Sequence, residues 1–127
     1  MIKVLIADVQ PMVRKGLRMR LATETDITIV GEASDGVELK NVLSEANPDV
    51  VILDTELLKG DGFATVRALR EASPLIDIIL LSLRGDPAMR LRAQNVGARA
   101  FIEKQEGVEK LLETLRQIQS SKGANDA

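Results

Sequence analysis

Four polar residues follow short apolar runs of this 127-residue chain: Asp8, Ser82, Lys104 and, most informatively, Asp54. Asp54 ends the apolar run 50–53, which has the character of a buried strand. Open α/β sheets bind their ligands in the crevice outside the carboxyl ends of the strands. Two carboxylates, a hydroxyl and an amine at one such edge indicate phosphoryl chemistry.

Five strand-like segments position these residues, and segments of helical period separate them. The strands are short, rich in β-branched residues and mostly apolar throughout, which is typical of strands covered on both faces. They are expected at residues 2–7, 27–33, 50–54, 78–82 and 100–103. The alternation predicts an α/β fold, a (βα)5 doubly wound five-stranded parallel sheet with right-handed crossovers.

Apolar residues that share one helical face predict the five helices. These residues are Val13, Leu17 and Leu21; Leu39, Val42, Leu43 and Ala46; Phe63, Val66 and Leu69; Met89, Ala93 and Val96; and Val108, Leu111, Leu112, Leu115 and Ile118. Pro11 and Pro87 fit the first turn of their helices. The turn 60–62 would open the third helix, and Gly97 lies where a C-terminal cap belongs.

The composition excludes several kinds of site. The chain has no cysteine, which removes disulfides, thiolate catalysis and most zinc sites. It has no histidine, which removes a Ser-His-Asp triad, histidine phosphotransfer and imidazole metal ligands. The net charge of -2 does not favour nucleic-acid binding by this segment. Only two aromatic residues are present, so the core must be aliphatic.

One domain is expected over residues 1–119. Residues 120–127 are small, polar and glycine-containing, and are interpreted as a frayed tail or the start of a linker to a missing output domain. The N-terminus has no long apolar segment or small-residue cleavage site, and no stretch approaches the length of a membrane span. A cytoplasmic protein is therefore expected.

Four motifs occur in order along the chain. They are the segment 4–17, the segment 30–36, the run 50–54 with Asp61 and Gly62, and the segment 97–104. Together they make the chain resemble the receiver domain of bacterial response regulators, the phosphoacceptor half of two-component signalling. The first two motifs resemble the subgroup that carries a helix-turn-helix output domain. The resemblance covers about residues 1 to 118 and implies the flavodoxin-like receiver fold.

The resemblance implies a role for each polar residue. Asp54 would take a phosphoryl group from a histidine kinase or other phosphodonor, giving an acyl phosphate. Asp8 and Asp54 would hold Mg2+. Lys104 would contact the phosphoryl oxygens, and Ser82 would donate its hydroxyl. Phe101 occupies the aromatic switch position, whose ring would turn inward when Ser82 moves toward the phosphate.

The implied output is a small shift in the face formed by the fourth helix, the fifth strand and the fifth helix. That face would control self-association, with a homodimer as the expected product. DNA would be reached only through an output domain, and the chain is not expected to be an enzyme.

The chain departs from the family pattern at the acidic pocket. Val9 replaces the second of two adjacent acids, so Mg2+ binding is expected to be weak and phosphorylation impaired. Leu83 stands where a small residue is usual and could narrow the path to Asp54. Leu58 stands where a proline is usual. Ser82 replaces a threonine but keeps the hydroxyl.

Glu56 and Arg84 border the same site. One hypothesis pairs them across the mouth of the pocket, as an exposed ion pair that would contribute little stability. Alternatively, Glu56 offers its side chain or its backbone carbonyl to the metal in place of the lost acid.

Simpler interpretations stay open for the same residues. Asp54 could be a strand-end carboxylate, and Asp8 could cap the first helix. Ser82 could be a packing residue, Lys104 a solvated lysine, and Phe101 a core ring. A basic stretch near the fourth helix is either a solvated face or a partner surface; its members are Arg84, Arg90, Arg92 and Arg99.

Two other functions compete with phosphorylation. A pseudo-receiver would act without phosphate, as a protein-interaction or dimerisation module. A small phosphatase or a flavodoxin-like electron carrier is a different class. A flavin site wants a phosphate-cradling loop after the first strand and aromatic rings for stacking. The segment 8–11 and the absence of Trp and Tyr argue against it.

Overall fold

Five parallel strands form one sheet in the computed structural model, which describes residues 1–57 and 62–126. The strands are β1 (Ile2–Ala7), β2 (Ile27–Ala33), β3 (Val50–Asp54), β4 (Asp77–Ser82) and β5 (Ala100–Glu103). Their order is β2-β1-β3-β4-β5, so β3 lies at the centre of the sheet with β1 and β4 on either side. This confirms the predicted (βα)5 sheet, and β4 alone starts one residue earlier than expected.

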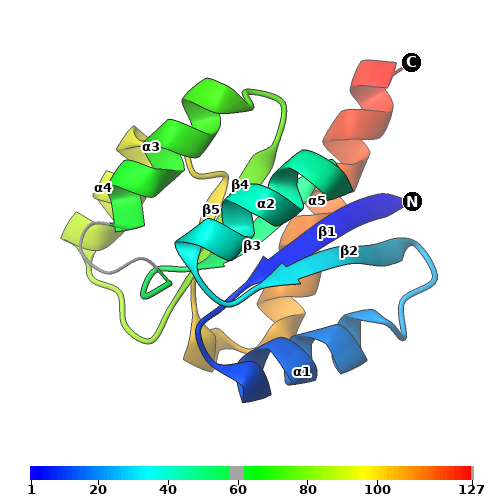
Figure 1. Ribbon diagram of the computed structural model, residues 1–127, viewed down its shortest axis with the longest axis horizontal. Coiled ribbons are helices and arrows are strands. Elements are labelled where there is room, and N and C mark those ends of the chain that lie inside the picture. Colours follow the sequence, from blue (N-terminus) through cyan, green and yellow to red (C-terminus); the bar gives the residue numbers. More distant parts are fainter. Residues whose placement is uncertain (58–61, 127) are drawn as a thin grey trace.

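Helices cover both faces of the sheet (Figure 1). They are α1 (Pro11–Leu21), α2 (Gly36–Ala46), α3 (Gly62–Ala72), α4 (Pro87–Asn95) and α5 (Val108–Asp126), with a short 3-10 turn, η1 (Lys104–Glu106), before α5. One buried layer packs the sheet against α1 and α5, and the other packs it against α2, α3 and α4. Strand side chains alternate between the layers: Val4 and Ile6 face the first, and Leu5 and Ala7 face the second.

The helix ends follow the local signals of the sequence. Pro11 and Pro87 stand in the first turns of α1 and α4. The side chain of Asp86 caps α4 by accepting a 2.8 Å hydrogen bond from a backbone N–H. Gly97 has a φ of 93°, the left-handed conformation that ends a helix. Of the expected turn at 60–62, only Gly62, at the start of α3, is described. The rest of that turn and Leu58 lie outside the described residues.

The last helix is longer than expected. α5 continues to Asp126, so the interpretation of the segment after residue 119 as a frayed tail is wrong for its backbone through residue 126. Lys122 lies 3.6 Å from a carboxylate oxygen of Asp77, and Arg99 lies 3.8 Å from the other oxygen. The Lys122 ion pair holds this part of α5 beside the start of β4, and the Arg99 pair joins the same aspartate to the residue before β5. A linker that begins here stays a prediction.

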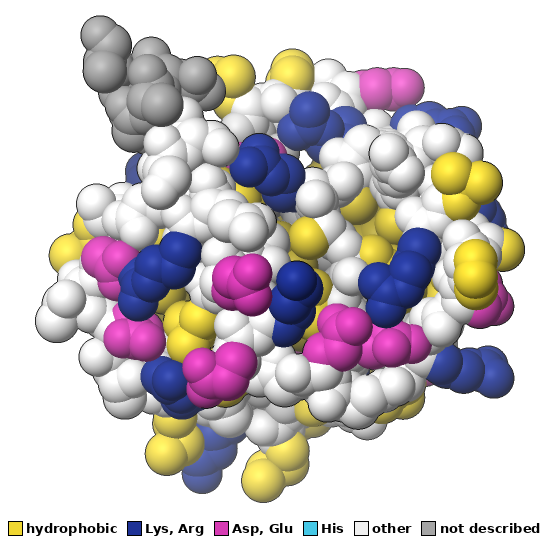
Figure 2. Space-filling model, turned by 180° about the vertical axis from the view of Figure 1, so that it is seen from behind, with side chains coloured by type: hydrophobic (Ala, Val, Ile, Leu, Met, Phe, Trp, Pro, Cys, Tyr) yellow, Lys and Arg dark blue, Asp and Glu magenta, His cyan; other side chains and the backbone are white. Residues whose placement is uncertain are grey.

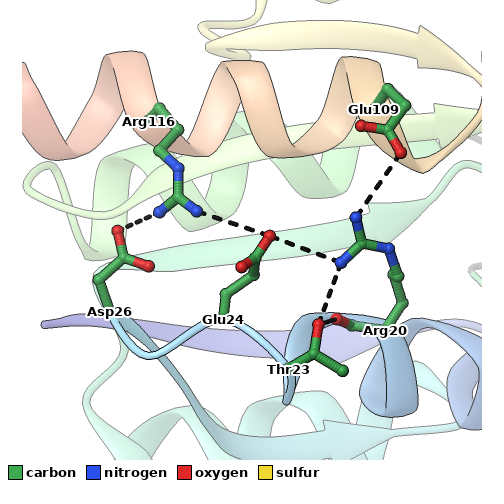
Figure 3. A network of polar contacts seen from close by, with 6 residues as sticks. All are labelled: Arg20, Thr23, Glu24, Asp26, Glu109 and Arg116. Carbon is green, nitrogen blue, oxygen red and sulfur yellow. Dashed lines mark hydrogen bonds and ion pairs between the residues drawn. The ribbon is translucent and has the colours of Figure 1, made fainter.

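A polar network joins α1, the loop before β2, and α5 (Figure 3). Its members are Arg20, Thr23, Glu24, Asp26, Glu109 and Arg116. Arg116 contacts Asp26 and lies 3.6 Å from Glu24, while Arg20 lies 3.6 Å from Glu109.

Viewed from behind, acidic and basic side chains alternate across the middle of the molecule (Figure 2). Every helix among the described residues is too short or too polar to span a lipid bilayer.

Candidate functional site

Asp8 and Asp54 meet because β1 and β3 are adjacent parallel strands in register. Ala7 pairs with Leu53, so the next residues, Asp8 and Asp54, lie side by side at the same edge of the sheet. Both carboxylates are buried, each residue being 1% exposed. The backbone carbonyl of Asp8 accepts a hydrogen bond from the Arg14 guanidinium, which fixes the loop between β1 and α1.

Lys104 brings a positive charge between the two carboxylates. It directly follows β5, and its Nζ lies 3.1 Å from Asp8 Oδ2 and 3.5 Å from Asp54 Oδ1. The side chain is 14% exposed, so the ion pairs are largely shielded from water. The structure therefore brings the two predicted acids and the predicted lysine into one cluster, and Lys104 is not the solvated lysine of the simpler interpretation.

Burial raises the pKa of the Asp54 carboxyl, because the charged form loses solvation. The backbone N–H of Glu56 donates to Asp54 Oδ1 at 3.1 Å and acts in the opposite direction. The charge of Asp8 raises this pKa and the charge of Lys104 lowers it. Without Lys104, the pKa of Asp54 would rise further.

Two carboxylate oxygens of this cluster make no hydrogen bond with the described residues and are the kind that a hard cation takes, although one of them, Asp8 Oδ2, is ion-paired with Lys104. Asp8 Oδ2 and Asp54 Oδ2 are buried and make no hydrogen bond within the described chain. Mg2+ is held in proteins by one or two carboxylates with several waters. The donor set fits this ion in kind but is small, since no group of three acids gathers among the described residues and the Val9 side chain offers no oxygen.

Asp8 does not cap α1 as the simpler interpretation had it. The N-cap residue of α1 is Gln10, which makes no side-chain capping bond. Asp8 Oδ1 instead accepts a 2.9 Å hydrogen bond from the Gln10 backbone N–H. One carboxylate oxygen thus fixes the loop, while the other faces Lys104.

Ser82 lies at the end of β4 and is 4% exposed. Its Oγ donates to the backbone carbonyl of Arg84 at 2.6 Å and accepts from Thr55 Oγ1 at 3.2 Å. Within the described residues its hydroxyl makes no hydrogen bond with Asp54. Ser82 is therefore a bonded hydroxyl beside the acidic cluster rather than a mere packing residue.

A cleft of about 890 Å³ opens beside the cluster, between the segments that follow β3 and β4. It is lined by Thr55, Glu56, Phe63, Ser82, Leu83, Arg84, Gly85, Asp86, Met89 and Arg92. Leu83 is half exposed at its wall.

The hypothesis that Glu56 and Arg84 pair across this mouth is wrong: both line the cleft, but they form no ion pair in the described chain. An exposed pair gains little energy for the side-chain freedom that it loses.

Phe101 on β5 packs against the segment that follows β4. A Cβ added to Gly85 would lie 2.5 Å from Phe101 Cε1, so the ring edge rests directly on the glycine. The Arg90 guanidinium of α4 lies 5.2 Å from the ring centroid and donates to the Phe101 carbonyl at 3.2 Å. It also lies 3.5 Å from Glu103 and 3.5 Å from Glu106. Arg90 thus ties α4 to β5 rather than only meeting solvent.

Comparison with known proteins shows which family has this arrangement. The model of the response regulator receiver domain matches residues 4–116. The chain belongs to this family. An uncharacterized transcriptional regulatory protein of Bacillus subtilis, YhcZ, is 37% identical over 116 residues, covering 91% of this chain and 54% of the relative. The receiver domain thus spans about half the length of that relative.

Another relative is named as an enzyme. A protein-glutamate methylesterase/protein-glutamine glutaminase of Nitratidesulfovibrio vulgaris is 37% identical over 106 residues, 83% of this chain and 29% of that protein. Among solved structures, the isolated receiver domain of RcsB from Salmonella enterica serovar Typhimurium, with a phosphomimetic beryllofluoride, has a TM-score of 0.87 at 27% identity. That match covers 94% of this chain and 88% of the RcsB chain.

Sequence reasoning missed three residues around the site. Thr55 reaches Ser82, Arg14 holds the Asp8 carbonyl, and Gly85 supports Phe101. Thr55 stood next to Asp54 and could have been considered for that reason. The contacts of Arg14 and Gly85 depend on loop conformations that no spacing in the sequence indicates.

Proposed function

We propose that this receiver domain accepts a phosphoryl group on Asp54 from a histidine kinase or another phosphodonor, and that Val9 impairs the reaction. One observation carries the proposal: Asp54 is buried beside Asp8 and Lys104 and keeps one carboxylate oxygen, Oδ2, free of hydrogen bonds within the described chain. An ionised carboxylate with an uncommitted oxygen is the nucleophile that acyl phosphate formation needs.

In the proposed reaction, Asp54 Oδ2 bonds to phosphorus as the bond between phosphorus and the donor's leaving atom breaks. The leaving group keeps that electron pair and takes up a proton. Lys104, 3.5 Å from Asp54 Oδ1, keeps the carboxylate ionised against the effect of burial and offers a positive charge to the phosphoryl oxygens. Ser82 would donate to one of those oxygens after leaving Arg84.

Mg2+, when bound between Asp8 and Asp54, would neutralise phosphoryl charge. The Val9 side chain supplies no oxygen, so among the described residues only two carboxylates gather here to hold it. The backbone carbonyl of Glu56 is a third possible oxygen. We therefore infer weak Mg2+ binding and slow phosphorylation.

The output of the proposed switch passes through the α4-β5-α5 face. When Ser82 releases the Arg84 carbonyl, the segment 84–85 is free to move. Gly85 of this segment packs against the Phe101 ring, over which the Arg90 guanidinium lies. A change there would alter the contact between α4 and β5, and with it homodimer formation. DNA would be bound by an output domain, as the transcriptional relatives and their greater length support. The role is regulatory rather than enzymatic, in the cytoplasm.

A pseudo-receiver is the second candidate, and one observation favours it. Lys104 already compensates both carboxylates, and the only proton of Ser82 is already donated to Arg84. The pocket is thus self-consistent without phosphate. In that case the same α4-β5-α5 face would bind a partner constitutively.

Beryllofluoride separates the two functions. Fluorine NMR of the wild-type chain at increasing Mg2+ should show a bound signal only at high Mg2+, and D54N should show none. A chain that gives no bound signal at any Mg2+ concentration would refute phosphoacceptance and leave the pseudo-receiver. Binding that saturates at low Mg2+ would refute the impairment by Val9.

A further inference from the structure

The Ser82 hydroxyl has no free hydrogen-bonding position. Its single proton goes to the Arg84 carbonyl, 2.6 Å away. Its oxygen accepts from Thr55 Oγ1 at 3.2 Å and from the Arg84 backbone N–H at 3.4 Å. A hydroxyl carries one proton and two lone pairs. All three positions are therefore filled before any phosphoryl group arrives.

Thr55 supplies one of these bonds from the turn that follows the neighbouring strand, β3. It directly follows Asp54, and its backbone N–H donates to the Leu81 carbonyl at 2.9 Å. This bond fixes the Thr55 backbone beside the end of β4, so its side chain faces Ser82 across the two strand ends. Because Ser82 is 4% exposed, water has little access to replace a lost partner.

We propose that Thr55 is a positioning residue that holds the Ser82 hydroxyl toward Arg84 and so sets how readily Ser82 turns to a phosphoryl group on Asp54. This inference rests on the proposed function. The Thr55 proton occupies one lone pair of Ser82 and thereby directs the Ser82 proton toward the Arg84 carbonyl. For Ser82 to donate elsewhere, both bonds must break or rearrange.

The same bonds connect the site to the ring of Phe101. Arg84 is followed by Gly85, which has no room for a Cβ against the ring. While the Ser82 hydroxyl is hydrogen-bonded to the Arg84 carbonyl, Gly85 stays packed against the Phe101 ring. Thr55 thus restrains both the Ser82 hydroxyl, which would contact the phosphoryl group, and the segment 84–85, which would move in response.

Thr55→Val tests the proposal because it removes the hydroxyl and keeps the β-branched shape. One hydrogen bond corresponds to a shift of about 2- to 10-fold in an equilibrium. Beryllofluoride affinity, measured by fluorine NMR at fixed Mg2+, should rise by about that factor in T55V. T55S, which keeps the hydroxyl, should match the wild-type chain.

A double-mutant cycle assigns the effect to Ser82. In the S82A background, T55V should leave beryllofluoride affinity unchanged, because the acceptor of the Thr55 bond is gone. Equal affinity of T55V and wild type, or an effect of T55V that persists with S82A, would overturn the inference.

A second measurement needs no adduct and keeps this inference separate from phosphoacceptance. Three-bond NMR couplings report the χ1 rotamer of Ser82 in the chain without phosphate analogue. Wild type and T55S should show one rotamer, and T55V an average of several. If no variant binds beryllofluoride, the proposed function fails while the couplings still decide: one unchanged rotamer in T55V overturns the role of Thr55.

Discussion

Replacing Lys104 by methionine should destabilise the fold in a way that depends on pH. The substitution keeps much of the side chain but removes the charge that lies 3.1 Å from Asp8 and 3.5 Å from Asp54. Two carboxylates that are each 1% exposed would then face each other without compensation. The lost partner, rather than lost packing, should dominate the effect.

The distances set the size of the effect. At an effective dielectric constant of about 20, each ion pair of Lys104 has a gross attraction of ~5 kcal/mol. Desolvation offsets most of that, and removing one partner of a buried pair typically costs about 3–5 kcal/mol. The Lys104 side chain is 14% exposed, so the lower end, about 3 kcal/mol at pH 8, is expected.

Acid should relieve this loss. Burial and Asp8 already raise the pKa of Asp54, and removing Lys104 removes an interaction that lowers it. A carboxyl whose folded pKa is raised contributes stability at low pH that is lost as pH rises through that pKa. The deficit of K104M relative to wild type should therefore shrink between pH 8 and pH 5.

Urea denaturation of wild type, K104M and K15M at both pH values measures this. Lys15 is exposed on α1 and forms no ion pair with the described residues, so K15M should stay within about 0.5 kcal/mol of wild type. A K104M variant as stable as K15M at pH 8 would refute the ion-pair account. So would a deficit that grows as the pH falls.

Two further substitutions probe the switch and the charge network. G85A places a Cβ 2.5 Å from the Phe101 ring, so the ring must move, and the Phe101 proton shifts should change; G16A, whose Cβ meets nothing within 4 Å, is the control. For Asp26, the hydrogen bond from Arg116 lowers the pKa, so its contribution is present at neutral pH and is lost as pH falls through that lowered value. D26N should therefore melt below wild type at pH 7 and together with it in strong acid; an unchanged melting temperature at pH 7 would contradict this.

The strands could be predicted closely because their chemistry is simple. Runs buried on both faces are apolar throughout, and each ends where a polar side chain reaches the sheet edge. The exception is the start of β4, where charged Asp77 pairs with Val50 in the sheet register. Its backbone N–H donates to the Asp49 carbonyl at 3.0 Å, which the type of side chain does not reveal.

The end of α5 shows why composition is a weak guide to helix length. Small, polar residues disfavour a helix only slightly, and tertiary contacts override that preference. Here Lys122 reaches Asp77, which is distant in sequence, and that contact supports the extra turns.

At the site, parallel topology alone brought Asp8, Asp54 and Lys104 to one edge, so their meeting was predictable. The predicted Glu56–Arg84 pair does not form among the described residues, because exposed side chains choose among conformations of similar energy. The bond from Thr55 to Ser82 depends on the backbone after β3, which no periodicity encodes.

The Mg2+ dependence of phosphorylation in wild type and V9D tests the central claim most directly. Both chains, with D54N as the negative control, are incubated with acetyl phosphate at a series of Mg2+ concentrations. The fraction of phosphorylated chain is then measured by intact mass spectrometry. V9D adds a carboxylate next to Asp8, so half-maximal adduct should need about tenfold less Mg2+ than in wild type, ~1.4 kcal/mol of ion binding. Identical Mg2+ curves for the two chains, or an adduct that persists in D54N, would contradict the account.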